Sequence, residues 1–302
     1  MAEIVGFVGL GVMGKPMAKN LIKSGYSLVV HSRSRGPVDE VVEAGAERAE
    51  SPADVARRAT VVITMLPDTP DVESVLTAPD GILSGVRPGA VVIDMSSISP
   101  PATRRLAAMV AARGASMLDA PVSGGEIGAV NASLSIMVGG DEAAFVRVRP
   151  ILAAMGNADR IVYIGESGAG QICKICNQIA IGGALAGVSE AFALARKAGI
   201  DAGRVRQALL GGFAASRVLE VHGERMLTGN YTPGFRAKLY QKDLRIANEA
   251  AATHAVAIPA TAIVTQLVNA LVASGGAELD YSALATVLFG LAERSAGGPQ
   301  PG

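Results

Sequence analysis

The chain has 302 residues, of which half are hydrophobic and only 4% are aromatic, and its 27 basic side chains balance 27 acidic ones. This length favours two domains, because a single hydrophobic core rarely grows beyond about 250–300 residues. The zero formal net charge offers no electrostatic attraction to nucleic acids or to anionic membranes. Two cysteines cannot cross-link a fold of this size, so a reduced, cytoplasmic setting is expected.

The first residues and the most apolar stretch both argue against export and membrane insertion. Met1 to Ile4 lack the basic segment of a secretory signal and lead at once into a strand-like run. The stretch Ile179–Val188 is interrupted by glycines and is shorter than the roughly 20 apolar residues that span a bilayer. We therefore expect a soluble protein without membrane or nucleic-acid partners.

Short apolar runs alternate with helical patterns up to about residue 162. Buried strands are predicted at Ile4–Val8, Leu28–Val30, Val61–Met65, Val91–Asp94, Met117–Leu118, Leu134–Val138 and Ile161–Tyr163. Helices between them are predicted at Val12–Ser24, Pro101–Ala112 and Glu142–Ala154. This alternation predicts an α/β fold over residues 1–164, a Rossmann-type, doubly wound parallel sheet with helices on both faces.

The strand pattern ends after Tyr163, and the rest of the chain has helical periodicity. The predicted helices are Gln171–Ala198, Ala202–Leu210, Arg217–Met226, Phe235–His254, Pro259–Ala273 and Tyr281–Arg294. We expect an all-helical domain for substrate binding and oligomerisation over residues 165–296. The Gly- and Pro-rich tail, residues 297–302, is predicted to be disordered.

A glycine-rich motif, Gly9-Leu10-Gly11-Val12-Met13-Gly14, follows the first predicted strand and opens the first predicted helix. In dinucleotide-binding folds, glycines at this spacing allow a tight turn, close approach of the pyrophosphate and close packing of helix on strand. The helix N-terminus then offers free N–H groups and a positive dipole end to the phosphates. A plain glycine turn is the alternative, but the strand–turn–helix context favours a dinucleotide site.

The second predicted strand leads into His31-Ser32-Arg33-Ser34-Arg35, with no carboxylate before Asp39. NAD-specific sites usually place Asp or Glu here, about 20 residues after the glycines. The hydroxyl of Ser32 and the guanidinium of Arg33 suit a 2′-phosphate instead, since Arg forms paired charge-assisted hydrogen bonds to it. The pattern favours NADP(H) as the cofactor and leaves NAD(H) open, because both arginines would also serve as solvated loop charges.

A second glycine-containing loop, residues 119–125, follows the predicted strand at Met117. Gly124 and Gly125 can leave backbone N–H groups pointing into a cleft, and Ser123 adds a hydroxyl. Such a nest binds a carboxylate well. A simple turn is the alternative for this segment.

Lys174 lies one turn into the long Gln171 helix, and Asn177 and Gln178 follow it three and four residues later, on the same face. An ammonium group there can give a proton to a carbonyl oxygen while the amide fixes the oxygen's position. Lys242 interrupts an otherwise apolar helical stripe and is a candidate to hold a cofactor or a carboxylate. For both lysines the alternative is an ammonium group that reaches solvent along an apolar stem.

Cys173 and Cys176 form a CxxC pattern, and three histidines are scattered along the chain. A redox role requires a thioredoxin-like setting, which is missing, and a zinc site requires two further ligands. Cysteines within an apolar helix usually behave as small hydrophobic residues. We therefore expect no metal.

Taken together, these motifs resemble those of the β-hydroxyacid dehydrogenase family over nearly the whole chain, from about Ile4 to Leu291. The motifs that carry the resemblance are GLGVMGKPM at residues 9–17, DMSS at 94–97, DAPVSGGE at 119–126, GAG at 168–170 leading to Lys174 and Asn177, and QKDL at 241–244. Five motifs in the family's order are a far more specific signal than any one of them.

The resemblance implies a role for each candidate residue. Lys174 would be the catalytic acid/base, Asn177 would assist it, and Ser123, Gly124 and Gly125 would hold the substrate carboxylate. The cofactor would be lined by Gly9, Leu10, Gly11, Val12, Met13, Gly14, Ser32, Arg33, Leu66, Pro67, Ser97 and Lys242. Family members that favour NAD often carry Asp at the position of Ser32, and they commonly form homodimers or homotetramers through their helical domains.

Residues 124–129, 133–140, 211–214 and 216–226 further resemble family members that act on a three-carbon 2-hydroxy-3-oxo acid. The expected reaction is reversible hydride transfer between NAD(P)H and C3 of this small-molecule substrate, giving D-glycerate, with Lys174 protonating the carbonyl oxygen. Relatives acting on 3-hydroxyisobutyrate share the core motifs, so 3-hydroxyisobutyrate, 4-hydroxybutyrate and glyoxylate stay open as substrates. A non-catalytic dinucleotide-binding module is the remote alternative.

Overall fold

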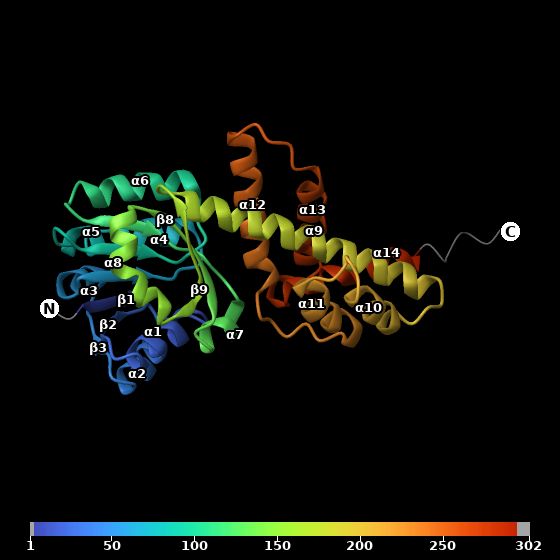
Figure 1. Cartoon of the computed structure of the whole chain (residues 1–302), viewed down its shortest axis with the longest axis horizontal. Helices are drawn as coiled ribbons and strands as arrows, with labels where there is room; N and C mark the ends of the chain where they lie inside the picture. Colours follow the sequence, from blue (N-terminus) through green and yellow to red (C-terminus); the bar gives the residue numbers. More distant parts are fainter. Residues whose placement is uncertain (1–2, 295–302) are drawn as a thin grey trace. The chain divides into compact units, whose positions relative to one another are not determined.

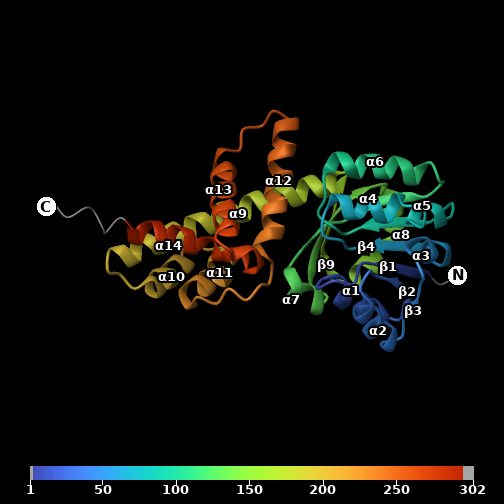
Figure 2. The ribbon, with the colours of Figure 1, turned by 180° about the vertical axis from the view of Figure 1, so that it is seen from behind.

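A computed structural model of the chain describes residues 3–294, and Figures 1 and 2 show its ribbon from opposite sides. The chain divides into two compact units, one ending at Lys174 and the other beginning at Ile175. The predicted disordered tail, residues 297–302, lies outside the described residues.

The first unit is built from alternating strands and helices. Its strands are β1 (Ile4–Val8), β2 (Ser27–His31), β3 (Glu47–Arg48), β4 (Val61–Thr64), β5 (Val91–Asp94), β6 (Ser116–Asp119), β7 (Val122–Ser123), β8 (Leu134–Gly140) and β9 (Gly156–Gly165). Its helices are α1 (Gly14–Lys23), α2 (Arg35–Glu43), α3 (Pro52–Arg58), α4 (Thr69–Thr77), α5 (Ile82–Gly85), α6 (Pro100–Ala111), α7 (Gly125–Val130) and α8 (Glu142–Ala153).

These strands form one sheet in the order β3-β2-β1-β4-β5-β6-β8-β7, with β9 paired to β8. All neighbours from β3 to β6 are parallel, whereas β8 is antiparallel to β6 and β7. The predicted Rossmann-type, mostly parallel sheet is confirmed. The direction of winding reverses between β1 and β4, and sheets of this kind bind ligands at the carboxyl ends of the strands near that point.

Both faces of the sheet are covered, which explains why its strands are apolar without alternation. Along β4, Val61 and Ile63 pack into one buried cluster with Met17 of α1. Val62, between them, packs into a second cluster on the other face with Val55 of α3. Figures 1 and 2 show α8 on one side of the sheet and α4 and α5 on the other. The two clusters are the hydrophobic cores of this unit.

Several elements of the first unit extend or shift the pattern expected from the sequence. The two-residue strands β3 and β7 are too short to show any periodicity. Strand β9 begins at Gly156 rather than near Ile161, because the exposed charged residues Asp159 and Arg160 hide the strand pattern. Helix α1 begins at Gly14 rather than Val12, since the preceding residues form the glycine turn.

The second unit is helical throughout its described residues, as predicted. It contains most of α9 (Ala169–Lys197), then α10 (Ala202–Leu210), α11 (Arg217–Thr228), α12 (Ala237–Thr253), α13 (Pro259–Ala273) and α14 (Leu284–Arg294). Two 3₁₀ turns, η1 (Gly276–Glu278) and η2 (Tyr281–Ala283), lie between α13 and α14. Leu185, Phe192, Tyr240 and Val268 belong to its buried core.

Helix α9 is 29 residues long and is the one described helix with the length and apolar composition to cross a membrane. The stretch Ile179–Val188 was predicted to be too short to span a bilayer. It is part of a longer helix, α9, which its glycines do not interrupt. Gly182 has a packing role there, because a Cβ atom at this position would lie 2.4 Å from the Tyr240 hydroxyl. Leu185 and Phe192 are fully buried, so this helix contributes to the hydrophobic core of the second unit.

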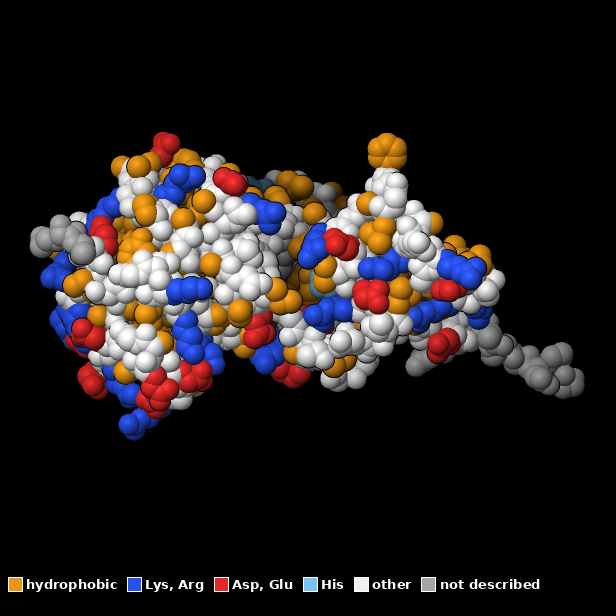
Figure 3. All heavy atoms as spheres, turned by 60° about the horizontal axis from the view of Figure 1, so that its bottom comes forward, with side chains coloured by type: hydrophobic (Ala, Val, Ile, Leu, Met, Phe, Trp, Pro, Cys, Tyr) orange, Lys and Arg blue, Asp and Glu red, His pale blue; other side chains and the backbone are white. Residues whose placement is uncertain are grey.

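Charges of both signs are mixed over the face of the molecule drawn in Figure 3. Exposed ion pairs of the protein include Lys15 with Glu40 at 3.0 Å and Arg105 with Glu73 at 2.8 Å. Exposed pairs of this kind contribute little, at most about 1 kcal/mol each. The fold therefore depends mainly on its buried clusters.

Candidate active site

The glycine turn between β1 and α1 depends on the absence of side chains at its two ends. Gly9 has a φ of +100°, and a Cβ atom there would lie 2.4 Å from the backbone oxygen of Met65, just past β4. A Cβ atom at Gly14 would lie 1.9 Å from the backbone oxygen of Gly9. The first glycine thus permits the turn, and the last permits close packing of helix on strand.

The middle of this turn is open, which is what a bound pyrophosphate needs. A Cβ atom at Gly11 would meet no other atom within 4 Å, and Val12 beside it is exposed. Met13, at the N-cap of α1, makes no side-chain cap hydrogen bond, and the first turn of α1 has no acidic residue. Because the helix N-terminus keeps its positive end toward this open space, the residues present fit the phosphates of a dinucleotide.

Ser32 and Arg33 follow β2, next to this turn. The Leu10 N–H donates to Ser32 Oγ at 3.3 Å, and the Gly9 N–H donates to the His31 carbonyl at 3.0 Å. The Arg33 side chain is 82% exposed, with its Nη1 atom 3.6 Å from Asp71 Oδ1 on α4. Ser32 is therefore brought to the glycine turn, while the Arg33 guanidinium lies at the surface with an acidic neighbour.

The loops after β4 and β5 are joined by Ser96. The Leu66 N–H donates to Ser96 Oγ at 2.9 Å. The Ser96 N–H in turn donates to Asp94 Oδ1 at 3.2 Å. Leu66 and Ser97 are half-buried and Pro67 is exposed, so all three predicted cofactor residues lie on loops at the carboxyl ends of the strands.

Asp94 is a fully buried carboxyl at the end of β5. The Thr64 hydroxyl donates to its Oδ1 at 2.8 Å, while its Oδ2 has no hydrogen-bond partner. Burial raises the pKa of Asp94 from 3.8 to about 6, against the lowering effect of these hydrogen bonds. The neighbouring carboxyl of Asp119, aligned with it on β6, also raises this pKa.

Asp119 holds the start of α9. The Gly168 N–H donates to its Oδ1 at 2.8 Å and the Gln171 N–H to its Oδ2 at 2.9 Å. A Cβ atom at Gly170 would lie 2.4 Å from the Met137 carbonyl of β8, so the helix begins in close contact with the sheet. Burial raises the pKa of Asp119, and these backbone hydrogen bonds oppose the rise. Asp119 thus caps the helix that carries Lys174.

Gln171 ties the same helix to the loop after β5. Its Oε1 accepts from the Ile98 N–H at 3.1 Å, and its Nε2 donates to the Ser96 carbonyl at 2.8 Å. Lys174 follows three residues later on the same face of α9 and is 9% exposed. Gln171 was not predicted as a site residue, although its spacing of three residues from Lys174 was a usable signal.

The loop predicted to hold a carboxylate contains two successive glycines in the left-handed region. Gly124 has a φ of +138° and Gly125 a φ of +61°. A Cβ atom at Gly124 would also lie 3.1 Å from the Leu134 side chain. Ser123 ends β7 and is half-buried, while Gly124 is exposed. This conformation suits a backbone nest for an anion.

In the second unit, a chain of side chains links Asn177 to Lys242. Asn177 Nδ2 donates to Gln178 Oε1 at 2.8 Å, and Gln178 Nε2 donates to Asp243 Oδ2 at 2.6 Å. The Lys242 ammonium lies 2.9 Å from the other oxygen of Asp243. The Tyr240 hydroxyl donates to the Gln178 carbonyl at 2.9 Å, which fixes α12 against α9. Asn177 and Lys242 are thus oriented by one buried pair, Gln178 and Asp243.

Cys173 is half-buried and Cys176 is exposed, and the two thiols are not joined in a disulfide. Within residues 3–294 no group of three or more His, Cys, Asp or Glu side chains is arranged to hold a metal ion.

Both units match models of known protein families. A family model for the NAD binding domain of 6-phosphogluconate dehydrogenase matches residues 4–165. A second model, for the NAD-binding region of NADP-dependent 3-hydroxyisobutyrate dehydrogenase, matches residues 168–288. Together the two models cover nearly all of the described chain.

Individual proteins give the same picture. The chain is 48% identical to 2-hydroxy-3-oxopropionate reductase from Escherichia coli (strain K12), over 94% of this chain and 96% of that protein. It superposes on a structure of Mycobacterium tuberculosis 3-hydroxyisobutyrate dehydrogenase with L-serine at a TM-score of 0.87, with 33% identity and coverage of 95% and 99%. A structure of Psf3 in complex with NADP+ and 2-OPP superposes at a TM-score of 0.85, with 28% identity and coverage of 94% and 100% of the two chains. The chain therefore belongs to the β-hydroxyacid dehydrogenase family of NAD(P)-binding oxidoreductases.

Proposed function

We propose that the protein reduces tartronate semialdehyde (2-hydroxy-3-oxopropanoate) to D-glycerate with NADPH as the preferred cofactor. The observation that carries this proposal is the anchored first turn of α9. Asp119 and Gln171 hold that turn to the ends of β6 and β5, and Lys174 follows as a buried ammonium group. The likeness to the Escherichia coli 2-hydroxy-3-oxopropionate reductase over nearly the whole chain supports the choice of substrate.

In this proposal Lys174 is the general acid and Asn177 assists it. Lys174 Nζ gives a proton to the aldehyde oxygen of the substrate, so that the developing alkoxide is neutralised as it forms. Asn177 follows on the same helix, with one N–H held by Gln178, and its amide orients the same oxygen. In the reverse direction the neutral Lys174 accepts the proton from the hydroxyl group.

The Ser123 hydroxyl and the backbone N–H groups of Gly124 and Gly125 bind the substrate carboxylate. Fixing one end of a three-carbon acid in this way makes the reaction effectively unimolecular. The carboxylate also distinguishes the substrate from uncharged aldehydes, because a backbone nest binds an anion.

The cofactor, when bound, supplies the hydride. The turn formed by Gly9, Leu10, Gly11, Val12, Met13 and Gly14 would hold its pyrophosphate, and Leu66, Pro67, Ser97 and Lys242 would line the rest. Ser32 and Arg33 would bind the 2′-phosphate of NADP(H), the reason for preferring it over NAD(H). The Asp71 carboxylate beside Arg33 tempers that preference, since it competes for the guanidinium.

The proposal extends to the assembly and its setting. Residues 1–164 would form the cofactor domain and residues 165–296 the substrate domain, through which the chain would form a homodimer or homotetramer. A cytoplasmic location would supply NADPH and keep both cysteines reduced.

The test is the initial rate of NADPH oxidation by purified protein with tartronate semialdehyde. We expect a kcat/KM of at least about 10⁴ M⁻¹s⁻¹, the lower end for natural enzymes, and a lower value with NADH. Glyoxylate in the same assay, and 3-hydroxyisobutyrate and 4-hydroxybutyrate with NADP+, serve as competing substrates. A higher kcat/KM for one of these would reassign the substrate and leave the reaction class intact.

The second candidate function is 3-hydroxyisobutyrate dehydrogenase. The observation in its favour is the superposition on the Mycobacterium tuberculosis enzyme over almost the whole chain. The substrate comparison above separates the two functions, because 3-hydroxyisobutyrate carries a methyl group where D-glycerate carries a hydroxyl group.

A further inference from the structure

Gln171 is a buried amide that clamps the backbone on both sides of Ser97. Its Oε1 accepts from the N–H of Ile98, and its Nε2 donates to the carbonyl of Ser96, at 3.1 and 2.8 Å. The side chain is only 1% exposed, so neither hydrogen bond is shared with bulk water. One amide therefore satisfies a donor and an acceptor two residues apart, as a neighbouring strand would.

The clamp extends to the loop after β4. Ser96, whose carbonyl accepts from Gln171, also accepts from the Leu66 N–H through its hydroxyl at 2.9 Å. The Gln171 backbone N–H is bound to Asp119 at the end of β6. The loops after three neighbouring strands, β4, β5 and β6, are thus connected through this one residue and its direct partners.

We propose that Gln171 is a positioning residue, which holds Ser97 and Lys174 in one frame. The inference rests on the proposed function, in which Ser97 lines the cofactor and Lys174 protonates the substrate. Lys174 lies three residues, or about 4.5 Å along the helix axis, from Gln171. Because both hydrogen bonds of the amide depend on its position, a rotation or shift of α9 relative to the β5 loop breaks them together. The amide thereby couples the placement of the acid to the placement of the cofactor.

The chemistry of the clamp dictates the variants that test it. Gln171→Met keeps the length of the side chain but has neither the donor nor the strong acceptor. Gln171→Glu keeps the acceptor for Ile98, but a carboxylate cannot donate to the Ser96 carbonyl. A protonated glutamic acid has both groups, so this variant regains the clamp at low pH.

The experiment measures the Kd of NADPH by its fluorescence and kcat with tartronate semialdehyde, at several pH values from 5.5 to 8.5. The Kd and kcat of each variant are divided by the values of the unmodified protein at the same pH. For Gln171→Met we expect NADPH to bind about 3- to 10-fold more weakly and kcat to fall about 10- to 100-fold at every pH, the range for two lost buried hydrogen bonds and a misplaced acid. At pH 8.5 the Kd and kcat ratios of Gln171→Glu should match those of Gln171→Met. Toward pH 5.5 they should recover at least severalfold.

Asn248 provides the matched control. Its Nδ2 donates to the Leu244 carbonyl at 2.8 Å and to Thr265 Oγ1 at 3.0 Å, within the helical unit. Asn248→Leu and Asn248→Asp repeat the loss of an amide and the exchange of an amide for an acid. We expect both to lower the melting temperature, and neither to change the Kd of NADPH by more than about twofold.

Recovery of the NADPH Kd ratio of Gln171→Glu at low pH supports the proposal even if Gln171→Met fails to fold. A Kd ratio that stays constant with pH, or an equal recovery in Asn248→Asp, overturns it. The Kd measurement needs no substrate. An unmodified protein that binds NADPH but does not reduce tartronate semialdehyde would therefore refute the proposed substrate and leave the clamp to be decided by the Kd ratios.

Discussion

Each unit of the molecule contains a buried carboxylate that holds loop backbone, but the two carboxylates are balanced differently. Asp119 in the first unit accepts from the N–H groups of Gly168 and Gln171 at the start of α9. Asp280 in the second unit accepts from the N–H groups of Gly234 and Phe235, at 3.0 and 3.1 Å. Asp280 also faces a cation, the guanidinium of Arg225.

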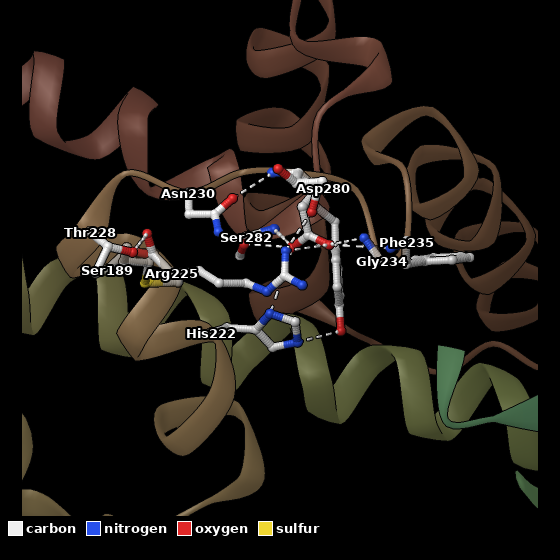
Figure 4. A network of polar contacts seen from close by, with 12 residues as sticks. Ser189, His222, Arg225, Thr228, Asn230, Gly234, Phe235, Asp280 and Ser282 are labelled. Atoms are coloured by element: carbon white, nitrogen blue, oxygen red, sulfur yellow. Dashed lines mark hydrogen bonds and ion pairs between the residues drawn. The ribbon is translucent and has the colours of Figure 1, made fainter. Parts of the chain in front are cut away.

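Figure 4 shows Arg225 and His222 pointing toward Asp280 from α11. The Arg225 guanidinium lies 3.5 Å from Asp280 Oδ2, and His222 Nδ1 lies 3.6 Å from Oδ1. His222 Nε2 is 2.9 Å from the Tyr281 hydroxyl. Asp280 and its partners therefore join α11 to the loops around α12 and η2. The Arg225 guanidinium balances the charge of the Asp280 carboxylate.

The first network consists of Asp94 and Asp119 with their partners, and the second of Asp280 with its partners. The stability that each contributes changes in opposite directions as the pH falls. In the first unit, burial raises the pKa of Asp94 to about 6, so its ionisation weakens the fold as the pH rises. In the second, burial lowers the pKa of His222, so its protonation weakens the fold as the pH falls. We therefore expect the buried carboxyls of the first network to position the proposed site, and the second network to stabilise the fold.

The largest effect is expected from Lys174→Ala, which tests whether the chemistry belongs to the first unit's network. If the chemistry lies where the first network anchors α9, kcat should fall about 10²- to 10⁴-fold, the usual contribution of a general acid, while NADPH still binds. Steady-state kinetics and a fluorescence titration measure the two effects. Lys197→Ala removes an exposed lysine from the same helix and should change kcat little. Near-normal turnover in Lys174→Ala would refute the mechanism.

The next largest effect is expected from Asp280→Asn, and on stability rather than on turnover. The substitution leaves the Arg225 charge without its buried partner and turns an amide N–H toward the N–H donors of Gly234 and Phe235. We expect the free energy of unfolding in urea to drop by about 3 kcal/mol, the lower end for a broken buried pair because Arg225 is partly exposed.

The control for this variant is Asp201→Asn, which alters an exposed cap of α10 and should cost at most about 1 kcal/mol. The kcat of folded Asp280→Asn should stay within about twofold of the unmodified value. A kcat loss as large as that of Lys174→Ala would mean that the second network also belongs to the active site, and the contrast between the two networks would fail.

The fold could be predicted from the sequence because its signals are local. The apolar run of β1 and the glycines at 9, 11 and 14 specify strand, turn and helix within eleven residues. The helical unit follows from periodicity in the same way. The two-residue strand β3 could not be predicted, because Glu47 and Arg48 pair with β2 through backbone hydrogen bonds that leave no side-chain pattern.

The candidate site, like the fold, could be predicted only where its sequence signals are local. The positive φ angles of Gly124 and Gly125 agree with a loop that only glycine allows, and a local motif contains that information. The link from Gln171 to Ser96 and Ile98 spans more than 70 residues and exists only once β5 and α9 have come together. Its one local sign was the three-residue spacing from Lys174. Asp280, likewise, gave no signal as the centre of a network, because apart from Ser282 its partners Gly234, Phe235 and Arg225 lie far away in the sequence.

A third, smaller effect concerns the pH dependence of stability in the first unit. The unfolded Asp94 ionises near 3.8, whereas in the folded chain its pKa is about 6. Stability should therefore fall as the pH rises from about 4 to about 6 and level off above that, by up to about 3 kcal/mol at about 1.4 kcal/mol per pKa unit. Asp94→Asn cannot ionise and should lack this fall when unfolding is measured in urea at pH 4, 5, 6 and 7. An unchanged profile would show that another group causes it.

The smallest effect is expected from His222→Phe, which tests the opposite response of the second unit. The ring keeps its edge-on contact with Tyr281, 4.8 Å between centroids, but the buried Tyr281 hydroxyl loses its partner. At pH 8 this should cost about 1 kcal/mol of unfolding free energy. Because the pKa of His222 is lowered, the unfolded chain takes up a proton near pH 6.5 before the folded one does, and the unmodified protein loses stability as the pH falls below that value. The variant has no such loss, so the gap between the two proteins should narrow from pH 7 to pH 5. A gap that widens instead would mean that Asp280 stabilises the protonated ring more than burial disfavours it, and both networks would then gain stability in acid.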